Sequence, residues 1–148
     1  MTADVHIHRH AAVGHLSLAR PRALHALNQG MCEAMGEALL SWREDEGVAA
    51  VILDHAEGRG FCAGGDVASV RNAVLAGEAR SARAGFAAEY RLNHLLFTYP
   101  RPVVAFMDGV TMGGGVGLAA PAAYRIATEN TLFAMPEGAI GLFPDVGS

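Results

Sequence analysis

Hydrophobic residues recur along this chain with two periods, one typical of strands and one typical of helices. Residues 5–18 alternate in short runs around Gly14, which predicts two adjoining strands followed by a break at 19–22. Apolar residues then recur at helical spacing over 28–46, where Asn28 is a suitable N-cap. The continuous aliphatic run 48–53 is typical of a strand buried on both faces.

The second half repeats this order with glycine-rich turns inserted. Asp66 is placed to cap a short helix that extends to about residue 72, and a longer helix is predicted over 82–97. One side of that longer helix carries Phe86, Tyr90, Asn93 and Phe97. Residues 103–107 form another buried strand, followed by glycines and a small-residue helix over 115–120.

The last third contains shorter elements. Strands are expected at 123–127 and 131–134, and Pro136 and Glu137 open a final helical turn before Gly141. This recurrence of strand, turn and helix predicts an α/β domain. Residues 143–148 end in a turn without a closing helix, so we expect 1–148 to be the N-terminal portion of a longer domain.

Composition removes several classes of function. The chain has 148 residues, of which 51% are hydrophobic and 18% charged, which favours one globular domain. All the basic residues are arginines scattered along the chain, and the net charge is −4, so no nucleic-acid partner is expected. Without lysine, a Walker-type phosphate loop and Schiff-base chemistry are both excluded.

The cysteine count and the distribution of apolar residues also bear on the cellular compartment. Cys32 and Cys62 are too few for a disulfide framework, which favours a reducing compartment. The first ten residues lack the apolar core of a signal peptide, and no stretch approaches the ~20 apolar residues that cross a bilayer. The expectation is therefore a cytoplasmic protein with no membrane partner.

Two glycine turns, at 62–66 and 113–115, are the strongest chemical signal. Each lies between a buried strand and the start of a helix, where backbone N–H groups are unpaired and glycine permits close approach to a ligand. Gly65 and Gly114 are our candidate donors for an oxyanion hole. A dinucleotide fingerprint fails because Leu118 replaces its third glycine, and no Gly-x-Ser-x-Gly elbow exists. Taken singly, each glycine is better explained by a tight turn or by close helix packing.

Longer motifs around these turns resemble a known family. The segments GFCAGGD (60–66) and DGVTMGGGVGL (108–118) resemble the enoyl-CoA hydratase/isomerase, or crotonase, superfamily. Residues 89–93, TLFAMPE (131–137) and IGLFPDVG (140–147) are similar to its 3-hydroxyisobutyryl-CoA hydrolase branch. The resemblance runs from about Arg20 to the last residue. It implies a crotonase-like ββα spiral core, without the C-terminal helices that complete the site and assemble trimers or hexamers in that family.

The resemblance assigns roles to individual residues. Gly65 and Gly114 match the two oxyanion donors, and Glu137 matches a catalytic carboxylate. Glu89, Gly114, Glu137 and Asp145 match positions that hold or convert the substrate in the hydrolase branch. Because coenzyme A enters as part of the substrate, the resemblance implies no separate cofactor.

A further match concerns the first turn of the family, which usually approaches the coenzyme A nucleotide. Arg22 and Ala23 lie at that place and are implied to bind the nucleotide. The full-length protein is implied to be a homo-oligomer.

Position 117 separates the members of this superfamily. Hydratases typically carry one glutamate at the place of Gly117 and a second at the place of Glu137, and a glycine cannot act as acid or base. Asp145 offers a second carboxylate instead. This favours hydrolysis of 3-hydroxyisobutyryl-CoA to 3-hydroxyisobutyrate and coenzyme A, a step of valine degradation. An enoyl-CoA hydratase or isomerase and an inactive acyl-CoA-binding remnant remain as alternatives.

The chemistry of Glu137 also stays open. It acts either as a nucleophile that gives a mixed anhydride or as the base for water, with Asp145 orienting it and Glu89 bonding the substrate hydroxyl. A glutamate at a helix start is equally explained by the helix dipole alone. The stripe His6, His8 and His10 is interpreted as a solvent face rather than a metal site, and Cys62 as packing.

Overall fold

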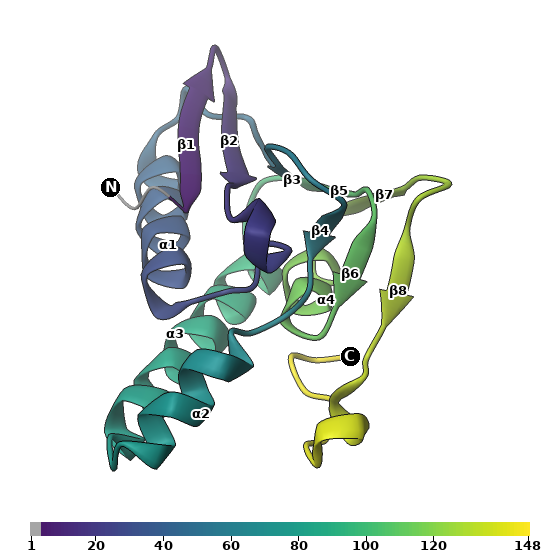
Figure 1. The fold of residues 1–148 in the computed structure, drawn as a ribbon. Coiled ribbons are helices and arrows are strands. Elements are labelled where there is room, and N and C mark those ends of the chain that lie inside the picture. The colour runs from purple at the N-terminus through teal and green to yellow at the C-terminus, as the bar shows by residue number, and fades with distance from the viewer. Residues whose placement is uncertain (1–3) are drawn as a thin grey trace.

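A computed structural model describes residues 4–148, and residues 1–3, part of the histidine-bearing start, lie outside the described residues. Its strands form a five-stranded sheet in the order β1-β2-β3-β5-β7 and a three-stranded sheet in the order β4-β6-β8 (Figure 1). In chain order the elements are β1 Val5–His10, β2 Val13–Leu18, η1 Pro21–Ala23, α1 Gln29–Glu44, β3 Ala50–His55, β4 Gly60–Cys62, α2 Val67–Leu75, α3 Ala79–Phe97, β5 Val103–Met107, β6 Val110–Met112, α4 Gly114–Ala119, β7 Tyr124–Ala127, β8 Leu132–Ala134 and η2 Glu137–Ile140. The predicted α/β class is confirmed.

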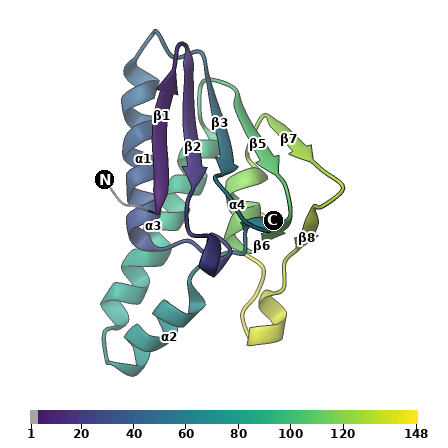
Figure 2. The same ribbon diagram turned by 45° about the horizontal axis from the view of Figure 1, so that its top comes forward.

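A ββα unit is the repeating element of the fold. Each of the strands β3, β5 and β7 is followed by a short strand that bends into the second sheet and then by a helix. Except for the antiparallel β1–β2 hairpin, neighbouring strands within both sheets are parallel. The C-terminal ends of the parallel strands therefore meet at one end of the molecule, where α2 and η2 lie (Figure 2). In open α/β sheets that end is where ligands bind.

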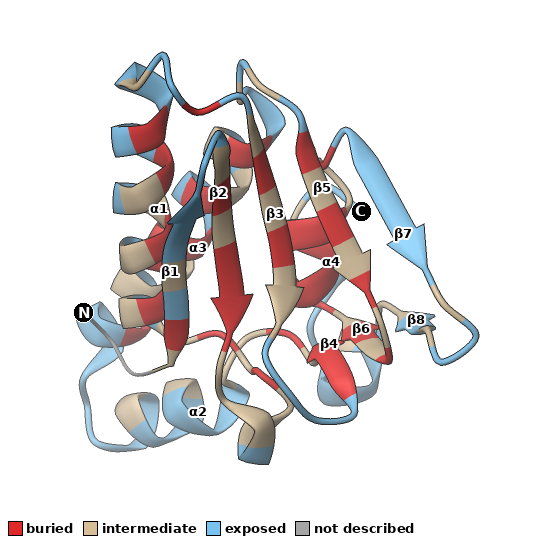
Figure 3. Cartoon of the chain, turned by 90° about the horizontal axis from the view of Figure 1, so that it is seen from above, coloured by how far each residue is buried: buried red, intermediate tan, exposed pale blue. Residues whose placement is uncertain are grey.

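The main core lies between the larger sheet and the helices α1 and α3. Figure 3 shows both helices behind the sheet, with the buried positions on β2, β3 and β5 facing them. Because α1 turns Met31, Met35 and Leu39 toward the sheet, its apolar stripe accounts for the predicted helical period. Asn28 caps this helix as predicted, its side chain accepting the Met31 N–H at 2.9 Å.

The two adjoining strands predicted around Gly14 are present as a hairpin, but Gly14 does not lie between them. The turn is at Ala11 and Ala12, and Gly14 lies inside β2 opposite Arg9. A side chain at position 14 would overlap the indole of Trp42, since an ideal Cβ would lie 2.6 Å from its Cζ3. Glycine is needed here for packing against α1 rather than for a turn.

The side of the long helix that carries Phe86, Tyr90, Asn93 and Phe97 is not its buried side. Phe97 is 77% exposed and Tyr90 is 44% exposed, whereas α3 buries Glu89, Leu92 and Leu96. The aromatic residues suggested a stripe, but leucine and alanine face the core and one carboxylate is buried among them. Strands β4 and β6 were not predicted, because three residues beside glycines carry no recognisable period.

The segment before α1 holds the first glycine turn in place. Leu27 donates its N–H to the Gly64 carbonyl at 2.7 Å and accepts the Asp66 N–H at 2.8 Å. His25 is fully buried, with Nδ1 accepting the Arg20 N–H and Nε2 donating to the Glu57 carbonyl. Burial lowers the pKa of this imidazole, so His25 is a neutral structural residue.

We predict that Gly14→Ala lowers the free energy of unfolding by about 1–3 kcal/mol, because the added methyl group forces the Trp42 ring out of its place. Gly36→Ala is the matched control, since nothing lies within 4 Å of a Cβ at that helical position. That control should gain about 0.5–1 kcal/mol. Urea unfolding followed by tryptophan fluorescence measures both variants, and equal midpoints for Gly14→Ala and the parent chain would contradict the packing argument.

Candidate active site

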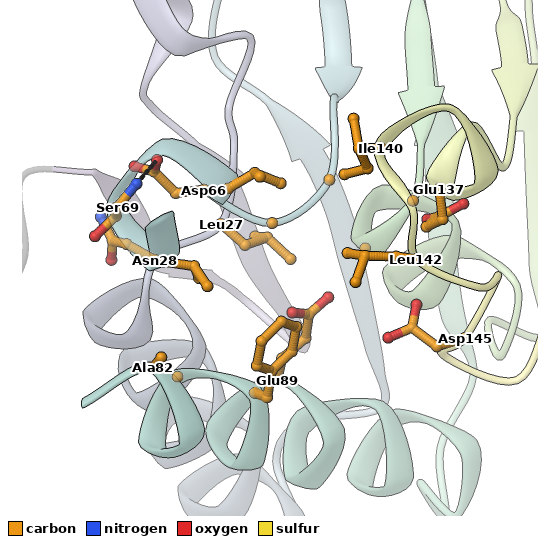
Figure 4. Close-up of a pocket in the computed structure, with 18 of the residues that line it drawn as sticks. Leu27, Asn28, Asp66, Ser69, Ala82, Glu89, Glu137, Ile140, Leu142 and Asp145 are labelled. Carbon is orange, nitrogen blue, oxygen red and sulfur yellow. Dashed lines mark hydrogen bonds between the residues drawn. The ribbon is translucent and has the colours of Figure 1, made fainter. Parts of the chain in front are cut away.

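A cavity of about 630 Å³ lies between α2, α3 and the segment 136–145. Most of its walls are apolar, and four acidic residues line it, namely Asp66, Glu89, Glu137 and Asp145 (Figure 4). Every residue predicted for the reaction itself lines this cavity, namely Gly65, Glu89, Gly114, Glu137 and Asp145. The fold thus brings together residues that are up to 80 positions apart in the sequence, 65 to 145.

The residues predicted to bind the nucleotide lie elsewhere. Arg22 and Ala23 belong to η1, and neither lines the cavity. Arg22 is exposed, and η1 follows directly on β2. Their role in binding coenzyme A stays a prediction.

The two glycine turns lie against each other at one wall. An ideal Cβ on Gly64 would be 3.3 Å from the Gly114 nitrogen, and one on Gly114 would be 3.3 Å from the Gly65 nitrogen. Gly64 and Gly113 have φ of +109° and +51°, a backbone region that favours glycine. Close contacts therefore leave little room for side chains at Gly64, Gly113 and Gly114, whereas a Cβ on Gly65 would make an ordinary contact.

This contact leaves two backbone donors unused. Gly114 is the first residue of α4, where an N–H has no partner within the helix. Among residues 4–148, no hydrogen bond uses the N–H of Gly65 or that of Gly114. The two N–H groups lie side by side next to the cavity, an arrangement suited to a negatively charged oxygen.

Glu89 approaches both turns from α3. A Cβ on Gly114 would overlap its Oε1, and one on Gly65 would lie 3.6 Å from its Oε2. Burial raises the pKa of Glu89 to about 7, and the charges of Asp145 and Glu137 add to this effect. Near neutral pH this carboxyl group is partly protonated and able to donate a hydrogen bond.

Glu137 and Asp145 enter from the opposite side. Glu137 is the first residue of η2, and its Oε1 would lie 2.8 Å from a Cβ on Gly113. Its Oε2 is buried without a hydrogen-bond partner among the described residues. Asp145 Oδ2 accepts the hydroxyl of Tyr90 at 2.6 Å, and this bond raises the pKa of Tyr90 to about 12. The Glu137 carboxylate is thus unpaired, whereas the Asp145 carboxylate is held by Tyr90.

Two neighbours of the site were not predicted as functional. Tyr90 was noted as part of a helix face and of the motif 89–93, without a role of its own, and its bond to Asp145 spans 55 positions, so sequence spacing did not indicate it. Val146 fills the space beside Gly117, where an ideal Cβ would lie 2.6 Å from the Val146 Cβ. A side chain at 117 is therefore excluded while Val146 keeps its place.

Cys62 and the histidines of β1 are not part of this site. Cys62 is fully buried, its thiol donates to the His25 carbonyl at 3.2 Å, and burial raises its pKa to about 12. His6, His8 and His10 are exposed on β1, with neighbouring ring centroids 6.2 and 6.1 Å apart. Within 4–148, no group of three or more His, Cys, Asp or Glu side chains is placed to hold a metal ion.

The described helices are all too short or too polar to cross a membrane.

Comparison with known proteins defines the class. Residues 13–148 match the family model described as enoyl-CoA hydratase/isomerase, so the chain belongs to this family. A solved structure of a carnitinyl-CoA dehydratase from Mycobacterium thermoresistibile superposes with a TM-score of 0.94 at 44% identity, covering 99% of this chain and 43% of that one. The crotonase-like fold is thereby confirmed.

Two curated relatives are informative. The chain is 52% identical over 134 residues to the mitochondrial 3-hydroxyisobutyryl-CoA hydrolase of Xenopus tropicalis, covering 90% of this chain and 34% of the relative. It is 47% identical to the small ribosomal subunit protein mS47 of Neurospora crassa, covering 90% of this chain and 27% of that protein. The chain thus spans about a third of the length of the curated relatives it matches.

The predicted compartment was wrong. The hydrolases of Xenopus tropicalis, Rattus norvegicus and Mus musculus are all named mitochondrial, which points to the mitochondrion rather than the cytoplasm. Both cysteines are free and buried, and their number alone could not separate these compartments.

We predict that Glu89→Gln removes part of the pH dependence of stability. A glutamate whose pKa rises from 4.5 to about 7 on folding stays protonated when the unfolded chain has ionised. The free energy of unfolding therefore falls as pH rises from about 4.5 to 7, and the loss is complete above pH 7. At about 1.4 kcal/mol per unit, the total is on the order of 3 kcal/mol.

Because glutamine does not ionise, Glu89→Gln should be more stable than the parent chain at pH 8 and nearly equal to it at pH 4. Denaturant unfolding at both pH values measures this difference. Glu37→Gln, on the exposed side of α1, is the control and should change stability by less than about 0.5 kcal/mol. A Glu89→Gln variant that is less stable at pH 8 would show that the buried carboxyl group is ionised and paired.

Proposed function

We propose that this site hydrolyses an acyl-coenzyme A thioester, with 3-hydroxyisobutyryl-CoA as the substrate. The observation that carries the proposal is the pair of unused N–H groups at Gly65 and Gly114 beside the unpaired carboxylate of Glu137. The identity to 3-hydroxyisobutyryl-CoA hydrolases supports the choice of substrate. Because the chain spans about a third of these relatives, the activity is proposed for the complete protein.

In the proposed reaction, the thioester oxygen accepts both glycine N–H groups. Negative charge grows on this oxygen as the carbonyl carbon becomes tetrahedral, and fixed donors stabilise that charge without reorganising. Glu137 removes a proton from water while the water oxygen bonds to the carbonyl carbon. The C–S bond then breaks, and coenzyme A leaves as a thiolate that takes up a proton.

A nucleophilic route uses the same atoms. Glu137 bonds to the carbonyl carbon, the thiolate leaves, and water cleaves the resulting mixed anhydride. Oε2 of Glu137 is free of protein partners, which supports either route. Hydrolysis in ¹⁸O-labelled water under single turnover tests the anhydride route, because label appears in the Glu137 carboxylate only if an anhydride forms and water attacks its Glu137 carbonyl carbon.

Glu89 fits a binding role rather than proton removal from water. With a pKa of about 7 it is partly protonated at neutral pH, and it lies against the turns that would hold the thioester oxygen. A protonated carboxyl group donates one hydrogen bond and accepts others, which suits a substrate hydroxyl. We assign that contact to Glu89 and keep proton removal for Glu137.

The solved dehydratase relative favours one competing reaction, the addition or removal of water at a double bond. Against it, Gly117 carries no carboxylate, and Val146 occupies the space where one would extend. The two reactions give different signals, since hydrolysis releases a free thiol and hydration removes the enoyl absorbance without doing so. The mS47 relative favours a third outcome, a folded chain that does neither.

We predict that the complete protein releases thiol from 3-hydroxyisobutyryl-CoA and that Glu137→Gln slows this release by about 10²–10⁴-fold, the usual contribution of a positioned base. A thiol-reactive dye measures the rate. Glu129→Gln, an exposed residue between β7 and β8, is the control and should retain the parent rate. Hydration of crotonyl-CoA without thiol release, or full activity of Glu137→Gln, would refute the proposal.

A further inference from the structure

The segment 143–148 reaches the site without support from regular structure. It follows η2 and contains no strand or helix. Within the described chain, its only backbone hydrogen bond is internal, from the Ser148 N–H to the Asp145 carbonyl at 3.0 Å. No backbone hydrogen bond therefore ties this segment to another element of the described chain, and the side-chain contacts of Asp145 and its neighbours become important.

Two such contacts are present, one on each side of the segment. On one side, Tyr90 of α3 donates its hydroxyl to Asp145 Oδ2 at 2.6 Å. On the other side, the Val146 side chain packs on Gly117 of α4, a residue without a side chain to obstruct it. Val146 has φ of +50°, which is unfavourable for a β-branched residue and must be compensated by its contacts.

Tyr90 is the better anchored partner in its hydrogen bond. It belongs to a 19-residue helix whose neighbours Glu89 and Leu92 are buried, so its backbone is fixed independently of the segment. The Phe86 ring, one helical turn earlier, lies against it with ring centroids 6.1 Å apart. Tyr90 therefore determines the position of Asp145, and not the reverse.

We propose that Tyr90 is a positioning residue, whose hydroxyl holds the Asp145 carboxylate at the cavity opposite Glu89 and beside Glu137. The bond engages Oδ2 and leaves Oδ1 available to water or substrate. Figure 4 shows the Asp145 and Glu89 side chains directed toward the same space. The kinetic part of this inference rests on the proposed thioester hydrolysis, whereas its structural part does not.

The variants that test this are Tyr90→Phe and a matched control, Tyr99→Phe. Tyr99 also donates its hydroxyl to a hydrogen bond, with the Leu39 carbonyl at 2.8 Å, but it does not line the cavity. Both changes remove one hydroxyl and keep the ring. Any difference between them therefore reports on Asp145 rather than on the loss of a hydrogen bond in general.

The structural readout is the NMR contact between the Val146 methyl groups and the Gly117 Hα. Tyr90→Phe should weaken this signal by more than half, because segment 143–148 loses its hydrogen bond to α3, and Tyr99→Phe should leave it unchanged. As an internal reference, contacts between Gly14 and Trp42 should persist in both variants. An unchanged Val146–Gly117 contact in Tyr90→Phe would overturn the proposal.

The hydrogen bond has a second signature that needs no turnover. Since the bond to Asp145 raises the pKa of Tyr90 to about 12, only about 1% of Tyr90 is ionised at pH 10. Asp145→Asn should raise that ionised fraction several-fold, while Asp54→Asn, on β3, should not. Ring-labelled tyrosine followed by NMR resolves the residue, and equal ionisation in both variants would overturn the proposed bond.

The kinetic readout is the division between kcat and KM for thiol release. Tyr90→Phe should lower kcat at least tenfold and leave KM within about twofold, because the substrate still binds while Asp145 is misplaced. Tyr99→Phe should keep both constants. A parent protein without thiol release would refute the proposed function and leave the NMR results to decide the role of Tyr90, whereas parental kcat in Tyr90→Phe would refute the positioning role.

Discussion

The close approach of two backbone turns is the constraint on which the site depends. Gly64 and Gly65 after β4 lie against Gly113 and Gly114 after β6, and the two short strands are neighbours in one parallel sheet. At this separation even one methyl group would contact the opposite backbone. The same contact that requires glycine leaves two N–H groups without acceptors, so the packing of the second sheet and the chemistry of the cavity have one cause.

Around those donors, the fold gathers negative charge at a cost in stability. Glu89 is buried among carboxylates instead of facing solvent, and its raised pKa measures the penalty for ionising it there. Asp145 lies on an irregular segment and is held by the hydroxyl of Tyr90. Its neighbour Val146 has a backbone conformation in the left-handed region and packs on Gly117. Such local strain and unfavourable charge are typical of functional sites, where geometry is maintained against the preferences of the individual residues.

The sequence was sufficient to predict those parts of the structure that depend on the spacing of hydrophobic residues and on local turn chemistry. The cap at Asn28, the strand 103–107 and both glycine turns were predictable because each signal lies within a few residues. The packing of Gly14 on Trp42 was not predictable, because nothing nearby in the sequence reveals the Trp42 ring, which comes from another element. The same limit applies to the Tyr90–Asp145 bond, the burial of Glu89 and the second sheet, since each depends on contacts between distant segments.

The central claim is that the N–H groups of Gly65 and Gly114 together bind the carbonyl oxygen of an acyl-coenzyme A thioester. The most direct measurement is a ¹H–¹⁵N NMR titration with acetyl-CoA, compared with S-ethyl-coenzyme A, a thioether that lacks the carbonyl group. Downfield shifts of both glycine amide protons with the thioester, and not with the thioether, are the predicted result. Saturating thioester that leaves both amide protons unmoved, or equal shifts with the two compounds, would contradict the account.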